Sequence, residues 1–128
     1  MTDYIDWDGV KVSLANDPGP TFNATFQGIY DEAFALLIDR QKKYGPENVA
    51  TQGFYGIFTR LSRDKIERLR RSLNGRIYHG VLELDAFEDA EDESIEDTLI
   101  DIANYALIML ALKRGVWGRP LESELKGR

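Results

Sequence analysis

Three long segments of the chain repeat apolar residues at the three- and four-residue spacing of an amphipathic helix. The first begins at Thr21 or Asn23, either of which is a good N-cap, and continues to Tyr44. Gly45 and Pro46 then end the helix, because glycine favours the helix C-cap and proline cannot continue a helix. The core-facing stripe predicted for this helix is Phe26, Ile29, Tyr30, Ala33, Phe34, Leu37 and Ile38.

The other two periodic segments predict a second helix over Gln52–Leu73 and a third from about Asp92 or Glu93 to Arg114. The third begins in acidic residues and ends in basic ones, as the helix dipole favours. Three long helices predict an all-α protein, a helical bundle with additional short elements.

The remaining segments contain little periodicity. Residues 1–20 read as an irregular N-terminal arm, in which Val10–Leu14 alternates like one short strand. The stretch Arg76–Asp92 reads as a loop with a short helical or extended piece. We therefore divide the chain into an arm at 1–20, a helical domain at 21–116 and a C-terminal tail at 117–128.

Composition excludes several kinds of site. The 128 residues include no cysteine and a single histidine, His79, so zinc-cysteine and multi-histidine centres are excluded and a catalytic triad is disfavoured. The net charge of −6 disfavours nucleic acid as a partner. Met1–Val12 does not resemble a signal peptide, and the apolar run Leu99–Leu112 is too short to span a membrane. We expect a cytoplasmic protein with no membrane partner.

The third helix carries an acidic ladder. On a helical wheel Glu93, Asp97, Asp101 and Asn104 fall within an arc of roughly 80°. Oxygen ligands without histidine or cysteine suit Mg²⁺ or Mn²⁺. The alternative is an acidic helix start followed by one buried salt bridge, since acids favour helix N-termini in any case.

From Leu99 onward the third helix is apolar almost all round, which predicts deep burial. Asp101 and Asn104 lie inside this stretch, and a buried carboxylate requires an arginine, a lysine or a metal ion. Because a three-helix monomer cannot easily cover such a helix, we expect a homodimer or homotetramer.

The second helix is basic, and one of its lysines lies in the apolar stripe. Lys65 falls in the middle of that stripe, so it either extends its amine to solvent or meets a buried anion. Asp101 or a bound phosphate could be that anion. The basic residues of this helix are Arg60, Arg63, Lys65, Arg68, Arg70 and Arg71.

The loop between the first two helices offers polar groups to a ligand. Lys43, Tyr44 and Asn48 flank the Gly45-Pro46 turn, ahead of the glycines of the second helix. Glycine-rich backbone at a helix N-terminus favours phosphate, although an ordinary loop explains the same residues.

Several of these segments resemble the nucleotide modification associated domain family, found largely in phages and bacteria. The resemblance covers roughly residues 40–112, and its most specific part is the string Asp-Thr-Leu-x-Asp-x-Ala-Asn-Tyr-Ala beginning at Asp97. More distantly the chain is similar to the all-α nucleotide pyrophosphohydrolases, including MazG and the dimeric dUTPases. That superfamily has Glu-x-x-Glu and Glu-x-x-Asp pairs, where this chain has Asp64-x-x-Glu67 and then Asp97 four residues before Asp101.

The resemblance implies a Mg²⁺-dependent pyrophosphohydrolase that converts a nucleoside triphosphate, standard or modified, to monophosphate and pyrophosphate. The alternative is a non-catalytic helical protein that binds nucleotides or assists nucleotide modification. In the enzyme, Glu93, Asp97 and Asp101 would hold the metal. The candidate catalytic residues are Asp64, Glu67 and Lys65, and the candidate substrate-binding residues are Lys43, Tyr44, Asn48, Arg60, Arg68 and Asn104.

Overall fold

The computed structural model describes residues 19–74, 77–78, 81–82 and 95–125, and these are predominantly helical. The all-α prediction is confirmed, with one two-residue antiparallel pair of strands in which Ile77 faces Leu82 and Tyr78 faces Val81. The elements in chain order are α1 (Phe22–Tyr44), α2 (Glu47–Arg60), a π-helical turn η2 (Leu61–Lys65), α3 (Ile66–Asn74), β1 (Ile77–Tyr78), β2 (Val81–Leu82), α4 (Ile95–Lys113) and α5 (Glu122–Leu125).

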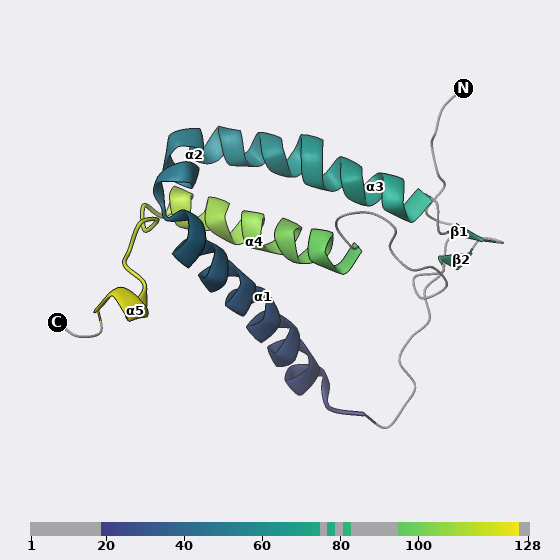
Figure 1. Cartoon of the computed structure of the whole chain (residues 1–128). Helices are drawn as coiled ribbons and strands as arrows, with labels where there is room; N and C mark the ends of the chain where they lie inside the picture. The colour runs from purple at the N-terminus through teal and green to yellow at the C-terminus, as the bar shows by residue number, and fades with distance from the viewer. Residues whose placement is uncertain (1–18, 75–76, 79–80, 83–94, 126–128) are drawn as a thin grey trace.

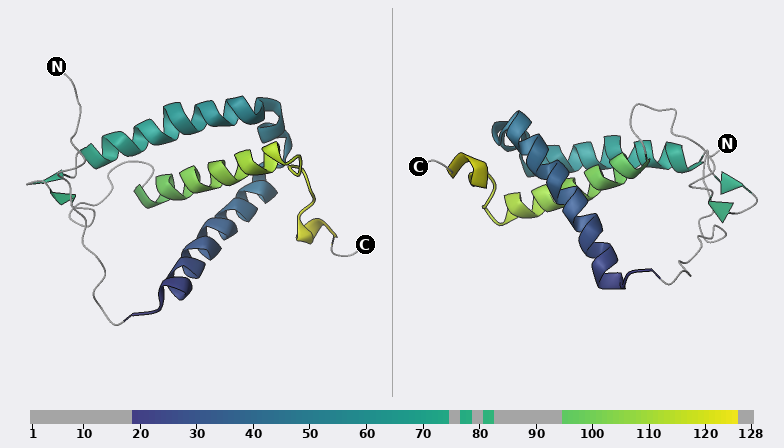
Figure 2. Two further views of the ribbon diagram at one scale, coloured as in Figure 1. Left: turned by 180° about the vertical axis from the view of Figure 1, so that it is seen from behind. Right: turned by 60° about the horizontal axis from the view of Figure 1, so that its bottom comes forward.

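Helix α4 is the centre of the arrangement. The α2, η2 and α3 segments form one bent arm that runs beside α4, and both α1 and this arm contact α4 (Figure 1). The C-terminal end of α1 lies close to the C-terminal end of α4. From there α1 diverges from α4 toward its own N-terminus, as the further views in Figure 2 also show. No helix among the described residues is long and apolar enough to cross a bilayer.

Both ends of α1 lie where the capping residues predict. The Thr21 hydroxyl accepts a hydrogen bond from the Ala24 backbone N–H at 3.2 Å, which satisfies one of the free donors of the first turn. At the other end Gly45 has φ 73°, and its N–H donates to the Gln41 carbonyl at 2.9 Å. Of the two candidate N-caps, Thr21 is therefore the one that the helix uses, and the predicted stop at Gly45 is confirmed.

Helix α2 begins earlier than predicted, at Glu47 instead of Gln52. The cause of the difference is Gly53, which has φ 71° and ψ −179° inside the helical segment. This backbone conformation is essentially restricted to glycine, and it bends the chain between a first helical turn and the long arm. The predicted helix start thus lies at the kink.

The apolar interior of the described chain is small. Its buried apolar residues are Ile57 of α2 and Ile95 and Ile108 of α4. The prediction that the whole α1 stripe faces the core is wrong for its N-terminal part, where Phe26, Ile29, Tyr30 and Phe34 are exposed. For the first turns of α1 the reason is the angle of the helix, which diverges from α4 toward its own N-terminus (Figure 1).

The described residues also leave the outward face of α4 uncovered. Leu99, Leu107 and Leu110 are exposed, so the deep burial predicted for this helix is wrong on one side. The opposite side contacts α1 and the bent arm. The predicted strand Val10–Leu14 and His79 lie outside the described residues.

Candidate functional site

Asp101 of α4 is the most buried charged side chain that the structure describes, at 2% exposure. Its Oδ1 accepts from Nη1 of Arg40 on α1, and its Oδ2 lies 3.1 Å from Nζ of Lys65 on η2. One carboxylate thus connects all three long helical segments. Burial of Asp101 matches the prediction made from the apolar pattern, and its pairing with Lys65 is one of the alternatives that this pattern leaves open.

Lys65 reaches Asp101 from the last residue of the π-helical turn. The Ile66 N–H donates to the Leu61 carbonyl, five residues back, which is the bonding pattern of a π-helix. Such turns contain one residue more than an α-helical turn and occur frequently at functional sites. The Lys65 side chain is 11% exposed, so its amine does not extend freely into solvent.

Asn104 lies one turn after Asp101 and connects α4 to α1 by a hydrogen bond. Its Nδ2 donates to the Ala33 carbonyl at 3.0 Å. Its Oδ1 is buried and has no hydrogen-bond partner within the described part of the chain. A buried acceptor without a partner is unusual, and such groups often mark a place where a water or ligand binds.

A cavity of about 450 Å³ lies beside this ion pair. It is lined by three cationic side chains, Arg40, Arg60 and Lys65, and by a single carboxylate, Asp101. The cavity is therefore locally positive although the chain carries a net charge of −6. Its other lining residues are Leu37, Gln41, Tyr44, Gly45, Asn48, Val49, Gln52, Ile57, Asn104, Tyr105, Ile108 and Trp117.

Half of the residues proposed from the sequence meet at this cavity. They come from the end of α1, from the bent arm and from α4, and they are Tyr44, Asn48, Arg60, Lys65, Asp101 and Asn104. Lys43 does not line the cavity; its amine lies 5.4 Å from the centre of the Tyr44 ring, a cation–π distance. Asn48 accepts a hydrogen bond from Gln52 Nε2 at its backbone carbonyl, at 3.2 Å.

The carboxylates proposed for the second helix lie elsewhere. Asp64 pairs with Arg68 at 3.1 Å, and Glu67 pairs with Arg70 at 3.4 Å. Each pair lies along one helix and is partly exposed, the setting in which an ion pair contributes little. Asp64, Glu67 and Arg68 do not line the cavity.

Of the acidic ladder, the structure describes Asp97 and Asp101. Asp97 is exposed, whereas Asp101 one turn later is buried, and Glu93 lies outside the described residues. Among the residues that the structure describes, no three acids or histidines come together as a metal site would require. Both Asp101 oxygens are already bound by Arg40 and Lys65. As they stand, the described side chains do not fit a Mg²⁺ centre.

Two important residues of the cavity were missed by the sequence patterns. Arg40 occupies a helical position with no periodic signal that marks it as a partner of Asp101. Trp117 falls in the predicted tail, yet its Nε1 donates to the Pro46 carbonyl at 3.1 Å and closes one side of the cavity. An isolated tryptophan just after a helix-ending glycine, Gly115, is the one signal that could have found it.

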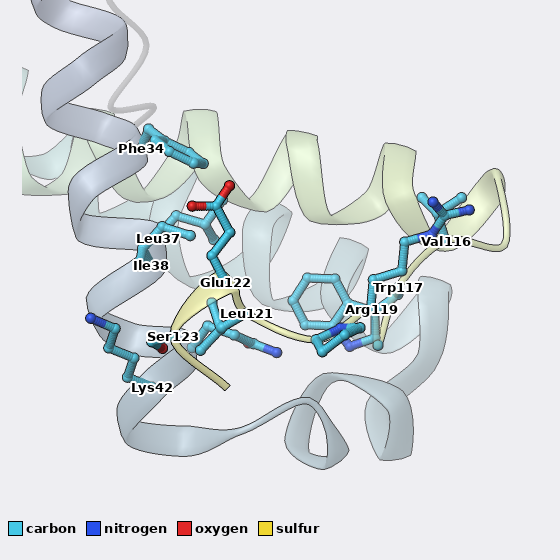
Figure 3. A pocket seen from close by; sticks show the side chains of 13 residues that line it. Phe34, Leu37, Ile38, Lys42, Val116, Trp117, Arg119, Leu121, Glu122 and Ser123 are labelled. Carbon is cyan, nitrogen blue, oxygen red and sulfur yellow. The ribbon is translucent and has the colours of Figure 1, made fainter. Parts of the chain in front are cut away.

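A second cavity, of about 480 Å³, lies between α1 and residues 116–123 (Figure 3). Its wall combines Phe34, Leu37 and Ile38 of α1 with Trp117 and Leu121, and its charged side chains include Lys42 and Glu122. None of the proposed site residues lines it. We therefore place the candidate site at the cavity beside Asp101, although the second cavity is slightly larger.

Comparison of the chain with protein-family models, with curated proteins and with solved structures finds no match. The family resemblance therefore rests on the residues quoted for it in the sequence. Function has to be argued from the chemistry of the cavity.

Proposed function

We propose that this protein binds a nucleotide in the cavity beside Asp101. The observation that carries the proposal is the charge of the lining, three cations against one carboxylate, in a chain of net charge −6. A concave site with convergent cationic groups attracts an anionic ligand, and low-dielectric walls strengthen that attraction. A phosphate ester matches this lining better than a neutral metabolite does.

Arg60 is the cation best suited to contact a phosphate. It lines the cavity, its side chain is exposed, and it has no ion-pair partner among the described residues. Arg40 and Lys65, in contrast, each donate to Asp101. A guanidinium can form two parallel hydrogen bonds to a phosphate, which gives it both affinity and orientation.

The rest of the lining suits a base and a sugar. Tyr44, Tyr105 and Trp117 supply aromatic surface from three segments of the chain. Stacking of a base on an aromatic ring contributes about 1–3 kcal/mol. The amides of Asn48 and Gln52 lie in the same wall and can bond polar edges of a base or sugar.

Isothermal titration calorimetry without metal tests this binding. We expect affinity to fall in the order triphosphate, diphosphate, monophosphate and nucleoside. Arg60→Gln should weaken triphosphate binding by tenfold or more, because a hydrogen bond to a charged group contributes about 1.5–3 kcal/mol. Arg63→Gln is the matched control: the arginine is exposed, three residues further along, and does not line the cavity.

Two outcomes would contradict the proposal. One is the absence of binding to any nucleotide at millimolar concentration. The other is an equal loss of affinity in Arg63→Gln, which would indicate general attraction to a basic helix.

We also propose, from the sequence resemblance alone, that the bound nucleotide is a triphosphate that is hydrolysed to monophosphate and pyrophosphate. Such hydrolysis depends on Mg²⁺ or Mn²⁺, which polarises phosphate oxygens. The described carboxylates do not form a metal site as they stand, so we assign no step to a metal. The competing function is nucleotide binding without turnover, as in an accessory or sensing protein.

Pyrophosphate release over a panel of standard and modified nucleotides, with Mg²⁺ or Mn²⁺, separates these functions. Asp97→Asn is the informative variant because Asp97 is exposed and the change removes the charge while keeping the size of the side chain. For an enzyme, activity and any metal-dependent rise in melting temperature should both disappear in this variant. Wild-type protein that binds nucleotides, releases no pyrophosphate and ignores both metals would leave only the binding function.

A further inference from the structure

Helix α4 presents a second apolar face that the described chain leaves uncovered. Leu99, Ala103, Ala106, Leu107 and Leu110 are all exposed, and at 100° per residue they form one stripe about 100° wide. This stripe lies opposite the buried residues Thr98, Asp101, Asn104 and Ile108 of the same helix, whereas the buried Ile95 lies beside one edge of the stripe. Burying the stripe would therefore leave the inward packing of α4 unchanged.

Four of the five residues of this stripe are arranged symmetrically about one point of the helix, and Leu107 is the exception. Leu99 and Leu110 are equally far from the point midway between Asn104 and Tyr105, and so are Ala103 and Ala106. A two-fold interface brings the same surface of both copies together, so that a residue on one copy meets its counterpart on the other. An antiparallel pair of α4 helices centred on that point would match leucine with leucine and alanine with alanine.

The charges at the two ends of the stripe follow the same symmetry. Glu96 and Lys113 are also equally far from the midpoint, both are exposed, and neither has an ion-pair partner among the described residues. In the antiparallel pair each Glu96 would face the Lys113 of the other copy. A parallel pair would place like charges together at both ends.

We propose that a second copy of this chain covers the stripe, as an antiparallel α4–α4 dimer with its two-fold axis near Ala103 and Ala106. The two alanines allow the helix backbones to approach closely, and the leucines on either side close the apolar contact. Since one pair of helices buries less area than a standard interface, we expect a micromolar dissociation constant. The nucleotide cavity lies on the opposite face of α4 and stays open in this dimer.

Sedimentation equilibrium of the full chain over a concentration series is the first test. We expect a reversible dimer for wild-type protein and monomer for Ala103→Glu, which places a charge at the closest approach of the helices. Ala50→Glu is the matched control, because Ala50 is exposed on α2 and the change in net charge is identical. A wild-type monomer at all concentrations, or a dimer that Ala103→Glu leaves intact, would overturn the proposal.

Charge exchange tests the register. Glu96→Lys and Lys113→Glu should each raise the dissociation constant about tenfold, because each creates two like-charged pairs in the dimer. The double variant restores opposite charges across the interface and should return to within about threefold of wild type. Each single change, and the double change, places a charge that is unfavourable for the dipole of α4. A recovery of dimer affinity in the double variant therefore cannot result from a more stable helix. A double variant weaker than either single would exclude the antiparallel arrangement.

Discussion

Asp101→Asn removes the charge that connects α1, η2 and α4 while keeping the side chain's size. Two cations then face a neutral amide, and one of them, Lys65, is nearly buried. Removing one partner of a buried ion pair costs about 3–5 kcal/mol, because the remaining charge has lost its compensation. Native domains are stable by only about 5–15 kcal/mol, so this variant should lose a large part of its folding free energy.

The cost should depend on which partner is removed. Lys65→Met leaves Asp101 bound to Arg40 and replaces a buried amine by an apolar chain of similar length. We therefore expect this variant to lose less stability than Asp101→Asn. In the double variant Arg40, whose side chain is 43% exposed, can turn toward solvent. The double variant should consequently be more stable than Asp101→Asn alone.

Urea denaturation followed by far-UV circular dichroism measures these differences, at one protein concentration because dimerisation would shift the midpoint. Asp97→Asn is the control: the same change one turn earlier on α4, at an exposed position, should cost no more than about 1 kcal/mol. The reasoning fails if Asp101→Asn costs as little as Asp97→Asn. It also fails if the costs of Asp101→Asn and Lys65→Met simply add in the double variant, since residues in contact should show coupling.

Changes at four further residues test the fold and the cavity wall. Gly53→Ala should destabilise by about 1–3 kcal/mol in urea melts because φ 71° with ψ −179° is strained for alanine, although no atom lies within 4 Å of the added Cβ. Gly28→Ala, in the regular part of α1 with the same open space, should instead stabilise by about 0.5–1 kcal/mol. Ile57→Ala should cost about 2–5 kcal/mol and Ile57→Val about 0.5–1.5, since this side chain is 1% exposed. Trp117→Phe keeps an aromatic ring but removes the Nε1 donor to Pro46, so protease cleavage after residue 115 should become faster while the helical circular dichroism stays the same.

The sequence predicted the helices where local chemistry determines them. The cap at Thr21, one of two candidates that the sequence offers, and the stop at Gly45 depend on neighbouring residues alone, and the structure contains both. The kink at Gly53 was missed because a glycine in a periodic segment is equally compatible with an uninterrupted helix. No local pattern distinguishes the π-helical turn at Leu61–Lys65 from an α-helix.

The site was predicted only as far as burial can be read from periodicity. Asp101 and Lys65 were identified because each interrupts an apolar face, and a buried charge requires a partner. Arg40 does not interrupt an apolar face, so hydrophobic periodicity does not identify it. Its contact with Asp101 depends on how α1 crosses α4, and periodicity does not specify that crossing. The same limit explains the exposed faces of α1 and α4. Periodicity indicates that a face is apolar, but it does not indicate whether the same chain or another copy covers it.

The ion pair at Asp101 and the positive cavity beside it are parts of one arrangement. Arg40 and Lys65 come from different helices, and without a carboxylate between them they would repel each other. Asp101 holds Arg40 and Lys65 at the cavity wall and neutralises one of their two positive charges. The three groups together therefore keep one positive charge, which attracts an anion. With Arg60, which has no ion-pair partner among the described residues, the wall carries a net charge of two in its lining residues. An apolar replacement for all three groups could make α4 equally stable, as it does for many buried ion pairs, but it would leave nothing to bind a phosphate.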